Sequence, residues 1–218
     1  MHRLIVFLLL NSFASVWAAD GPPPSGPMAG FVRYEFNKWL FFPCTAVKSG
    51  AKAPTGLPVI DATPGGTLFK AIQQRWQQST DPLRGVYLEF AGYQENQRAT
   101  AIELWRALGW VESCKQRPTN VKANARLWAA GNEPFWNFTL DDKQAVFQQS
   151  GATAKRFPAA RVRTEGPTSI WQTGDSKSGL RAEFISELCT DTMSEAVFGR
   201  KVVLTADGKQ FTGCGFVR

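Results

Sequence analysis

The segment "GRKVVLTADGKQFTGCGF", residues 199 to 216, indicates the fold class, because it contains two short strand-like stretches joined by one tight turn. The pair Asp207-Gly208 separates "KVVLT" from "KQFTGC", and this dipeptide is typical of two-residue β-hairpin turns. No other hairpin signal in the chain is as strong. The segment therefore predicts antiparallel β-structure, and the neighbouring sequence can be interpreted outward from it.

The rest of the second half repeats this pattern at intervals of about ten residues. Gly, Asp or Pro turns separate short stretches that read as strands: "ARLWAAG", "FWNFTLDD", "QAVFQQSG", "TSIWQTGD" and "LRAEFISELC". Strands at this spacing are typical of a sandwich or a barrel. We expect no long helix there.

The first half mixes strands with one helix. Leu68, Ile72 and Trp76 lie at helical spacing in "TLFKAIQQRWQQS", with Thr67 as the expected N-cap. Strands are expected in "GFVRYEFNKWLFFPC", "PVIDATPGG" and "RGVYLEFAGYQ". "TAIELWRALGWVESC" fits a strand or a helix turn, and we prefer a strand ending at Cys114. The predicted fold is mainly β (α+β), with two small β-barrel-like domains, the first bearing one amphipathic helix.

The first residues, "MHRLIVFLLLNSFASVWAAD", have a basic residue, a short apolar run and then small residues. This is the pattern of a secretory signal peptide over residues 1–18, with cleavage after Ala18. The apolar run falls short of the ~20 residues that cross a bilayer, so no transmembrane anchor is expected. A periplasmic or secreted location follows.

The expected organisation after the signal has three parts. Residues 19–30, rich in Pro and Gly, should form a flexible leader. An N-terminal small β-barrel-like domain with one helix follows over 31–118, and a C-terminal β-barrel domain covers 124–218. The polar stretch "SCKQRPTNVKANA", residues 113–125, is the expected boundary between them.

The composition excludes several kinds of chemistry. The single histidine is His2, inside the expected signal, so catalysis by a Ser-His-Asp or Cys-His arrangement and imidazole-bound zinc are not expected. The formal net charge is +7, and the basic residues are scattered rather than clustered. An exported protein with scattered charge is expected to contact anionic envelope components loosely and to bind no nucleic acid.

Four cysteines, Cys44, Cys114, Cys189 and Cys214, are expected to be oxidised in such a compartment. Four cysteines can pair in three ways. We expect Cys44 with Cys114 and Cys189 with Cys214, because each bridge then stays inside one half of the chain. Closing loops of about 70 and about 25 residues would contribute roughly 4.4 and 3.5 kcal/mol. A thiolate metal site lacks the CxxC spacing, so no metal, copper included, and no cofactor is expected.

Three motifs carry a resemblance to a known family: "GNEPFW" at 131–136, "CTDTMS" at 189–194 and "GCG" at 213–215. Together they resemble the C-terminal domain of a bacterial envelope family, many of whose members are described as lipoproteins. The resemblance implies a C-terminal barrel similar to META domains. "WLFFPC" and Cys114 match the family's upstream segment more loosely, and the first half is similar to the small barrels of copper-resistance lipoproteins. The chain lacks the family's lipid-anchoring cysteine.

These motifs also contain the candidate ligand-binding residues, Glu133, Trp136, Asp191 and Ser194. In a structural interpretation, Phe135 and Trp136 lie in the barrel core, and Glu133 is a hydrogen-bonded corner. In a functional interpretation, the four candidates line the barrel mouth as one polar-aromatic site. The sequence leaves both open.

We therefore expect a non-enzymatic envelope protein, a binding or stress-related module for an envelope ligand or protein, with no catalytic residue. The alternative is a periplasmic lysozyme-inhibitor-like protein of the same size. The positive net charge of this chain argues against the inhibitor alternative, because lysozyme is also basic and the two proteins would repel each other. A carboxylate-based hydrolase using Glu89, Glu133 or Asp191 is a further alternative, although their spacing selects no pair.

Overall fold

The computed structural model describes residues 25–44, 55–78, 85–109, 114, 124–174 and 179–218. The expected signal peptide, its cleavage near Ala18 and most of the expected domain boundary at 113–125 lie outside these residues. In the part of the chain that is described, no helix has the length and apolarity needed to span a membrane.

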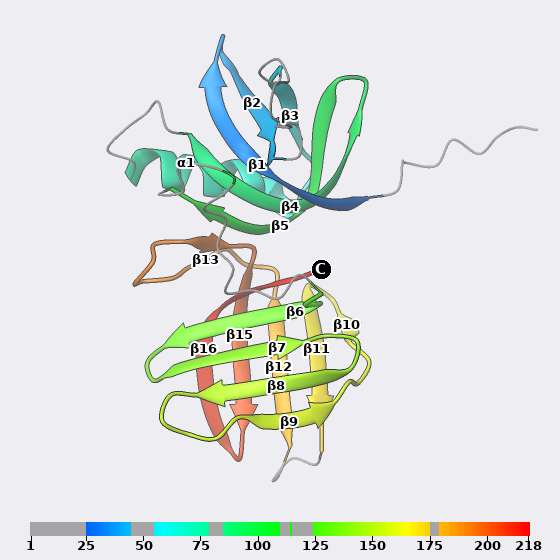
Figure 1. Cartoon of the computed structure of the whole chain (residues 1–218), viewed down its shortest axis with the longest axis vertical. Helices are drawn as coiled ribbons and strands as arrows, with labels where there is room; N and C mark the ends of the chain where they lie inside the picture. Colours follow the sequence, from blue (N-terminus) through cyan, green and yellow to red (C-terminus); the bar gives the residue numbers. More distant parts are fainter. Residues whose placement is uncertain (1–24, 45–54, 79–84, 110–113, 115–123, 175–178) are drawn as a thin grey trace, which may run out of the picture.

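The first unit is a closed barrel of five strands (Figure 1). Its elements are β1 (Gly26–Glu35), β2 (Lys38–Pro43), β3 (Leu57–Asp61), the 3-10 turn η2 (Pro64–Gly66), α1 (Thr67–Gln78), β4 (Val86–Glu95) and β5 (Arg98–Leu108). Neighbouring strands follow the order β5-β3-β2-β1-β4, and β4 pairs with β5 to close the ring. Only the β3–β5 pairing is parallel. α1 lies between the third and fourth strands of this barrel.

β1 begins earlier than the sequence pattern indicated. Gly26 pairs with Gly92 of β4, so residues 26–30, expected in a flexible leader, form the start of a strand. The ladder of backbone hydrogen bonds with β4 explains the difference, because composition alone does not reveal a pairing partner.

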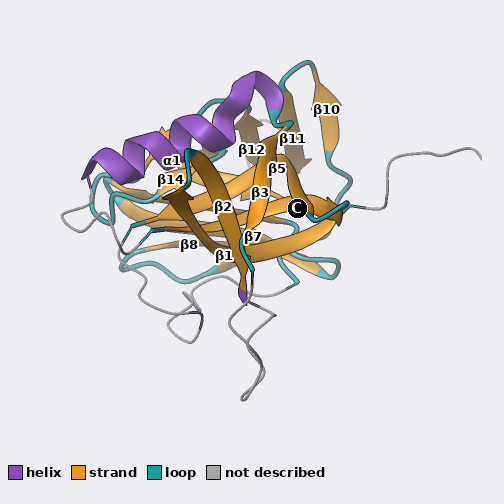
Figure 2. Ribbon diagram, turned by 90° about the horizontal axis from the view of Figure 1, so that it is seen from above, coloured by secondary structure: helices purple, strands orange, loops and turns teal. Residues whose placement is uncertain are grey.

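α1 lies along one side of the first barrel (Figure 2) and buries one face. Leu68 and Ile72 are fully buried with Phe41 and Phe90, whose rings lie 5.1 Å apart. Thr67 is not the cap that was expected. The N–H groups of Leu68 and Phe69 donate instead to side chains of Thr63 and Asp61, over 3.1 and 2.8 Å.

The second unit is a nine-stranded antiparallel sheet curled into a half-barrel. In spatial order its strands are β10 (Arg163–Glu165), β11 (Thr168–Thr173), β12 (Leu180–Ile185), β15 (Arg200–Ala206), β16 (Lys209–Val217), β6 (Leu127–Asn132), β7 (Phe135–Leu140), β8 (Gln144–Gln149) and β9 (Lys155–Pro158). β6 to β9 cross in front of β11, β12, β15 and β16, so the sheet folds over onto itself (Figure 1). The two barrel-like units and the single helix confirm the predicted fold class.

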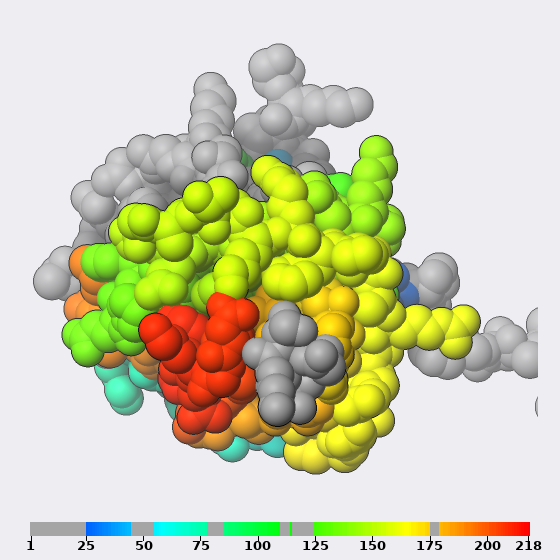
Figure 3. All heavy atoms as spheres, turned by 90° about the horizontal axis from the view of Figure 1, so that it is seen from below, coloured from blue at the N-terminus to red at the C-terminus, as the bar shows by residue number. Residues whose placement is uncertain are grey.

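Aromatic side chains fill the inside of this curled sheet. Phe138 is fully buried, with Trp171 at 5.2 Å and Phe184 at 6.3 Å between ring centroids. The predicted Asp207-Gly208 turn joins β15 to β16, and both residues have positive φ. Seen from below (Figure 3), this turn (red) lies against the yellow-green segment of the same sheet, where Lys155 pairs with Asp207.

One hairpin of the second half belongs to the first sheet. β13 (Cys189–Thr190) and β14 (Val197–Phe198) pair with each other, and β14 pairs with β5 of the barrel. α1 also reaches this hairpin, because Gln74 Nε2 donates to Thr190 Oγ1 over 2.8 Å. Residues 189–198 of the expected C-terminal domain therefore belong to the sheet of the first unit.

A third buried cluster joins the two units. Trp128 stacks on Phe198 at 5.4 Å and on Phe216 at 5.8 Å. Beside them, the guanidinium of Arg106 forms a bidentate pair with Glu89 at 2.9 and 3.1 Å. Burial of these large rings between the units favours one rigid body over two loosely linked domains.

The two disulfides are Cys44–Cys114 and Cys189–Cys214, as predicted. The second has a spatial role that its short sequence separation does not indicate. Cys189 lies in β13 of the first sheet, whereas Cys214 lies in β16 of the second. This bridge therefore ties the inserted hairpin to the curled sheet.

Candidate functional site

The "GNEPFW" segment forms the hairpin between β6 and β7. Asn132 pairs with Phe135 and Gly131 with Trp136, so Glu133 and Pro134 form the turn, and their peptide bond is cis. Because side chains alternate across a strand, neighbouring aromatic residues point to opposite faces. Trp136 is only 3 % exposed, whereas Phe135 is 52 % exposed. The structural interpretation therefore describes Trp136 correctly and Phe135 wrongly.

Trp136 explains why two of the motifs contain glycine. A Cβ at Gly131 would lie 2.3 Å from Trp136 Nε1, and one at Gly213 would lie 2.1 Å from Ala130 O and 2.8 Å from Trp136 Cζ2. These distances are shorter than real contacts allow. The indole ring thus occupies space that side chains at these two positions would need, and the backbones of β6 and β16 pass close to it.

The "CTDTMS" segment is held by Asp191. Its Oδ1 accepts hydrogen bonds from the N–H of Met193 (3.1 Å), the N–H of Ser194 (2.7 Å) and the hydroxyl of Ser194 (2.8 Å). The Asp191 N–H donates to Ala196 O over 2.9 Å. This is the capped turn that Asp and Ser side chains favour.

A hydrogen bond joins the two motifs. Asn132 Nδ2 donates to the second oxygen of Asp191, Oδ2, over 3.1 Å, and Thr192 Oγ1 lies 3.4 Å from the same nitrogen. The Cys189–Cys214 disulfide lies beside this contact. Segments almost sixty residues apart in sequence are thereby held in one fixed arrangement.

These hydrogen bonds change the acidity of Asp191. Burial raises the pKa of its carboxyl group, but the hydrogen bonds from Ser194, Asn132 and Met193 outweigh burial and lower the pKa below its ordinary value of 3.8. Both oxygens of the ionised group already accept hydrogen bonds. Asp191 is therefore a fixed anion that organises the loop, and it is poorly suited to donate a proton.

A polar cleft of about 410 Å³ lies between the motifs. Its charged lining residues are Glu133, Asp191 and Lys201, and its neutral polar lining residues are Asn132, Thr190, Thr192, Gln210 and Thr212. The floor is formed by Gly213 and the disulfide. The cleft thus offers both signs of charge together with several hydroxyl and amide groups, which suits a small, hydrogen-bonding ligand.

A second cleft, of about 390 Å³, lies on the other side of the β6–β7 hairpin. It follows the outer face of β6, β7 and β8. Its lining includes Trp128, Phe135, Asn137, Thr139 and Gln148, and none of its lining residues is charged. Asn132 and Gly131 line both clefts, so the hairpin forms the wall between them.

The structure distributes the four candidate residues among different roles. Glu133 and Asp191 line the polar cleft, as the functional interpretation required. Trp136 is a core residue whose edge borders the neutral cleft. Ser194 hydrogen-bonds Asp191 and does not line either cleft. The four residues therefore belong to one connected region but do not form one site.

Sequence reasoning missed several residues of this region. Asn132 joins the two motifs, although it was not among the candidate residues. Met193 is 67 % exposed beside the polar cleft, and Phe135 is exposed beside the neutral one. Strict alternation along "FWNFTL" would have placed Phe135 on the outer face with Asn137. No local signal indicates Met193 or Lys201, because their positions depend on how the sheets pack.

The arrangement contains few of the features of a catalytic or metal site. In the described part of the chain, no three His, Cys, Asp or Glu side chains are grouped as metal ligands. All four cysteines are in disulfides. No family model, curated protein or solved structure matches this chain, so the chemistry of the site rests on its own geometry.

Proposed function

We propose that this protein is a non-enzymatic binding protein of the cell envelope, and that it takes a small polar ligand in the cleft between "GNEPFW" and "CTDTMS". The observation that carries the proposal is the Asn132–Asp191 hydrogen bond beside the Cys189–Cys214 disulfide. Together they hold two loops rigid while leaving a polar cleft open between them. Binding to a preformed site avoids the entropic cost of ordering loops.

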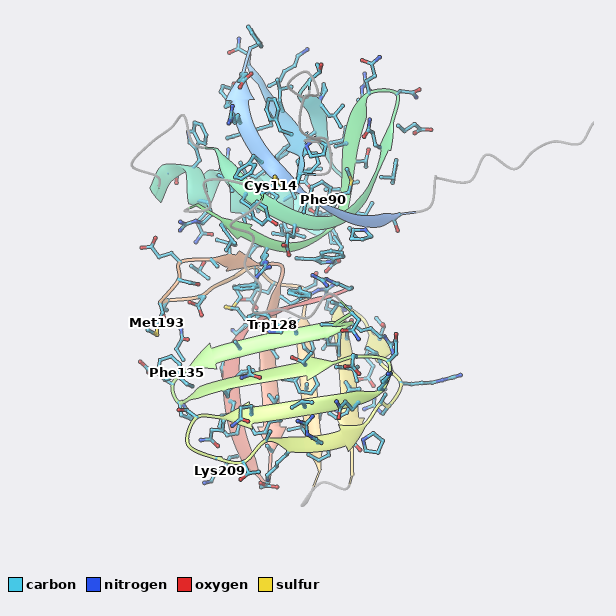
Figure 4. All side chains as sticks on the ribbon, in the orientation of Figure 1. Phe90, Cys114, Trp128, Phe135, Met193 and Lys209 are labelled. Atoms are coloured by element: carbon cyan, nitrogen blue, oxygen red, sulfur yellow. A yellow bond between two sulfur atoms is a disulfide. The ribbon has the colours of Figure 1, made fainter. Side chains whose placement is uncertain are left out.

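Two large apolar side chains are exposed on the segments that border the cleft, although neither of them lines it. Phe135 and Met193 are large and exposed, and each comes from a different motif. In Figure 4 their labelled side chains lie on the same side of the molecule. A ligand with both polar groups and an apolar face would match such a surface, and a peptide-bearing sugar of the envelope has this chemistry.

The envelope location is part of the same proposal. It is supported by the signal-like residues 1–18 and by the resemblance of three motifs to an envelope family. The oxidised cysteines are consistent with it, because disulfides persist in exported proteins.

A carboxylate-based hydrolase is the second candidate, because Glu133 and Asp191 line the same cleft. A hydrolase of this kind needs one carboxyl group that can act as an acid. The lowered pKa of Asp191 and its four hydrogen bonds make it unsuitable for that role. Glu133 would have to be the acid and Asp191 the base or nucleophile, although both oxygens of Asp191 already accept hydrogen bonds.

The test is a titration of the isotopically labelled protein with soluble muropeptides, followed by amide chemical shifts. We expect saturable shifts at Glu133, Lys201 and Thr212. Lys201→Gln should weaken binding about tenfold, because one charge-assisted hydrogen bond is lost. Ile60→Ala removes an exposed apolar side chain of the first barrel and serves as the matched control.

Two outcomes would contradict the proposal. The first is that muropeptides, neutral oligosaccharides and short peptides all fail to shift the cleft amides. The second is hydrolysis of the added muropeptides that disappears in Glu133→Gln, which would support the enzyme instead.

A further inference from the structure

The turn between β1 and β2 has an unusual residue at its tip. Phe36 and Asn37 connect the strands, with φ of 51° and 60°. Two positive φ values are typical of a type I′ turn, which normally begins with Asn, Asp or Gly. Phe36 is bulky and therefore disfavoured there. It is also 89 % exposed, so no packing in the protein stabilises it.

Two other hairpins of the chain have polar residues or glycine at the same turn positions. The β4–β5 turn is Asn96-Gln97 and the β15–β16 turn is Asp207-Gly208, all with positive φ. Among the described residues with positive φ, Phe36 is the only aromatic one. A residue in a disfavoured backbone conformation, with its ring in solvent, points to a role outside folding.

Further aromatic side chains follow Phe36 along the hairpin. Tyr34, two residues earlier, is 51 % exposed and contacts Trp39 across the hairpin at 5.1 Å. Trp39 in turn contacts Trp76 of α1 at 5.4 Å. Tyr34, Trp39 and Trp76 therefore form an aromatic row from the hairpin to the helix, and Phe36 lies two residues beyond Tyr34 at the tip.

The charges around this row are mainly positive. Arg33 and Lys38 lie on the opposite face of the hairpin from Tyr34 and Trp39, and Lys70 lies on α1; all three are exposed. Arg33 also lies over the Phe42 ring at 5.3 Å, and Lys38 lies opposite Glu35. Glu35 is the one acidic residue of the hairpin, and α1 contains none. The whole chain carries a formal net charge of +7.

We propose that the β1–β2 tip inserts Phe36 into anionic lipid membranes, with Tyr34 and Trp39 at the headgroup level and Lys38 and Arg33 against the phosphates. Aromatic rings with a polar edge favour the membrane interface, and basic residues favour anionic lipid. The tip also projects at the end of the molecule far from the second sheet (Figure 1). A projecting two-residue tip is too small to bury the roughly 800 Å² per partner of a stable protein interface.

The test uses the whole exported chain and vesicles of phosphatidylcholine with or without phosphatidylglycerol, separated by flotation. We expect binding only to the vesicles containing phosphatidylglycerol. Phe36→Asn should reduce that binding at least about tenfold, because the inserted ring is lost. Asn suits the turn, so the variant should unfold at the same temperature or higher. Its thermal midpoint separates lost insertion from lost folding.

Ile60→Ala is the control, since it removes an exposed apolar side chain of the same barrel that has no place in the proposed tip or cleft. It should bind vesicles like the wild type. The inference is wrong if Phe36→Asn binds anionic vesicles as tightly as the wild type, or if the wild type binds none. Neither result bears on the polar cleft, because this surface is independent of it.

Discussion

The buried ring of Trp136 limits which residues can occupy the neighbouring positions. Its ring lies between Gly131 and Gly213 and contacts Phe147 and Phe211, both at 6.3 Å between centroids. Gly131 of "GNEPFW" and Gly213 of "GCG" thus have a steric explanation. Because Trp136 is buried, only the neighbouring side chains that point outward can contact a ligand.

Gly131→Ala tests this explanation. The added methyl group would lie 2.3 Å from Trp136 Nε1 and 2.5 Å from Thr212 O, so the ring or the strand must move. We expect the free energy of unfolding to fall by about 2–3 kcal/mol, as in other overpacked cores. Urea denaturation measures this. Gly26→Ala, which meets nothing within 4 Å, should change it by less than about 0.5 kcal/mol.

At the scale of elements, the β13–β14 hairpin determines how the candidate site is built. It pairs with β5 of the barrel, is bonded to β16 through a disulfide, and positions Asp191 against Asn132. The sequence pattern predicts no hairpin over residues 189–198 and singles out only Cys189, Asp191 and Ser194 there. Strands of two residues have no periodicity from which a pairing partner could be predicted.

The lowered pKa of Asp191 makes the stability of this hairpin dependent on pH. Because the pKa is lower in the folded protein, the stabilisation is fully present above about pH 4 and is lost as the pH falls through the folded pKa. Asp191→Asn should be less stable than the wild type at pH 7, and the difference should shrink at pH 3. Urea midpoints at both values measure it.

The exposed Asp142→Asn is the control, and its difference from the wild type should stay small at both pH values. A gap for Asp191→Asn that is equally large at pH 3 and pH 7 would show that its carboxylate charge does not stabilise the fold.

At the scale of the whole molecule, the two units are joined through a core that contains charge as well as aromatic rings. Glu89 is 1 % exposed and pairs with Arg106, while Tyr87 donates to Glu89 over 2.9 Å. Nearby, Arg200 of the second sheet pairs with Glu103 of β5 at 2.7 Å. Burial raises the pKa of Glu103, and the positive charge of Arg200 opposes this effect.

Arg106→Leu should destabilise both units together. It leaves the buried Glu89 carboxylate without its bidentate partner, and such losses cost about 3–5 kcal/mol. We expect a single, shifted denaturation transition in urea, followed by fluorescence. Arg98→Leu changes an exposed arginine of the same strand and should shift the midpoint little. Replacing Glu89 by Gln in Arg106→Leu should recover part of the loss. Equal destabilisation by Arg98→Leu would contradict a special role for the buried pair.

The sequence by itself determined the β-rich class, the helix and the Asp207-Gly208 hairpin, because side-chain alternation and turn dipeptides depend on neighbouring residues and can be recognised without a structure. The disulfide pairing was predicted on a different ground, that each bridge stays inside one half of the chain. Only the tertiary structure decided that residues 189–198 join the first sheet, that Asn132 meets Asp191, and that Phe36 projects into solvent. These features depend on which surfaces pack together across the chain, and single-sequence patterns do not encode that choice.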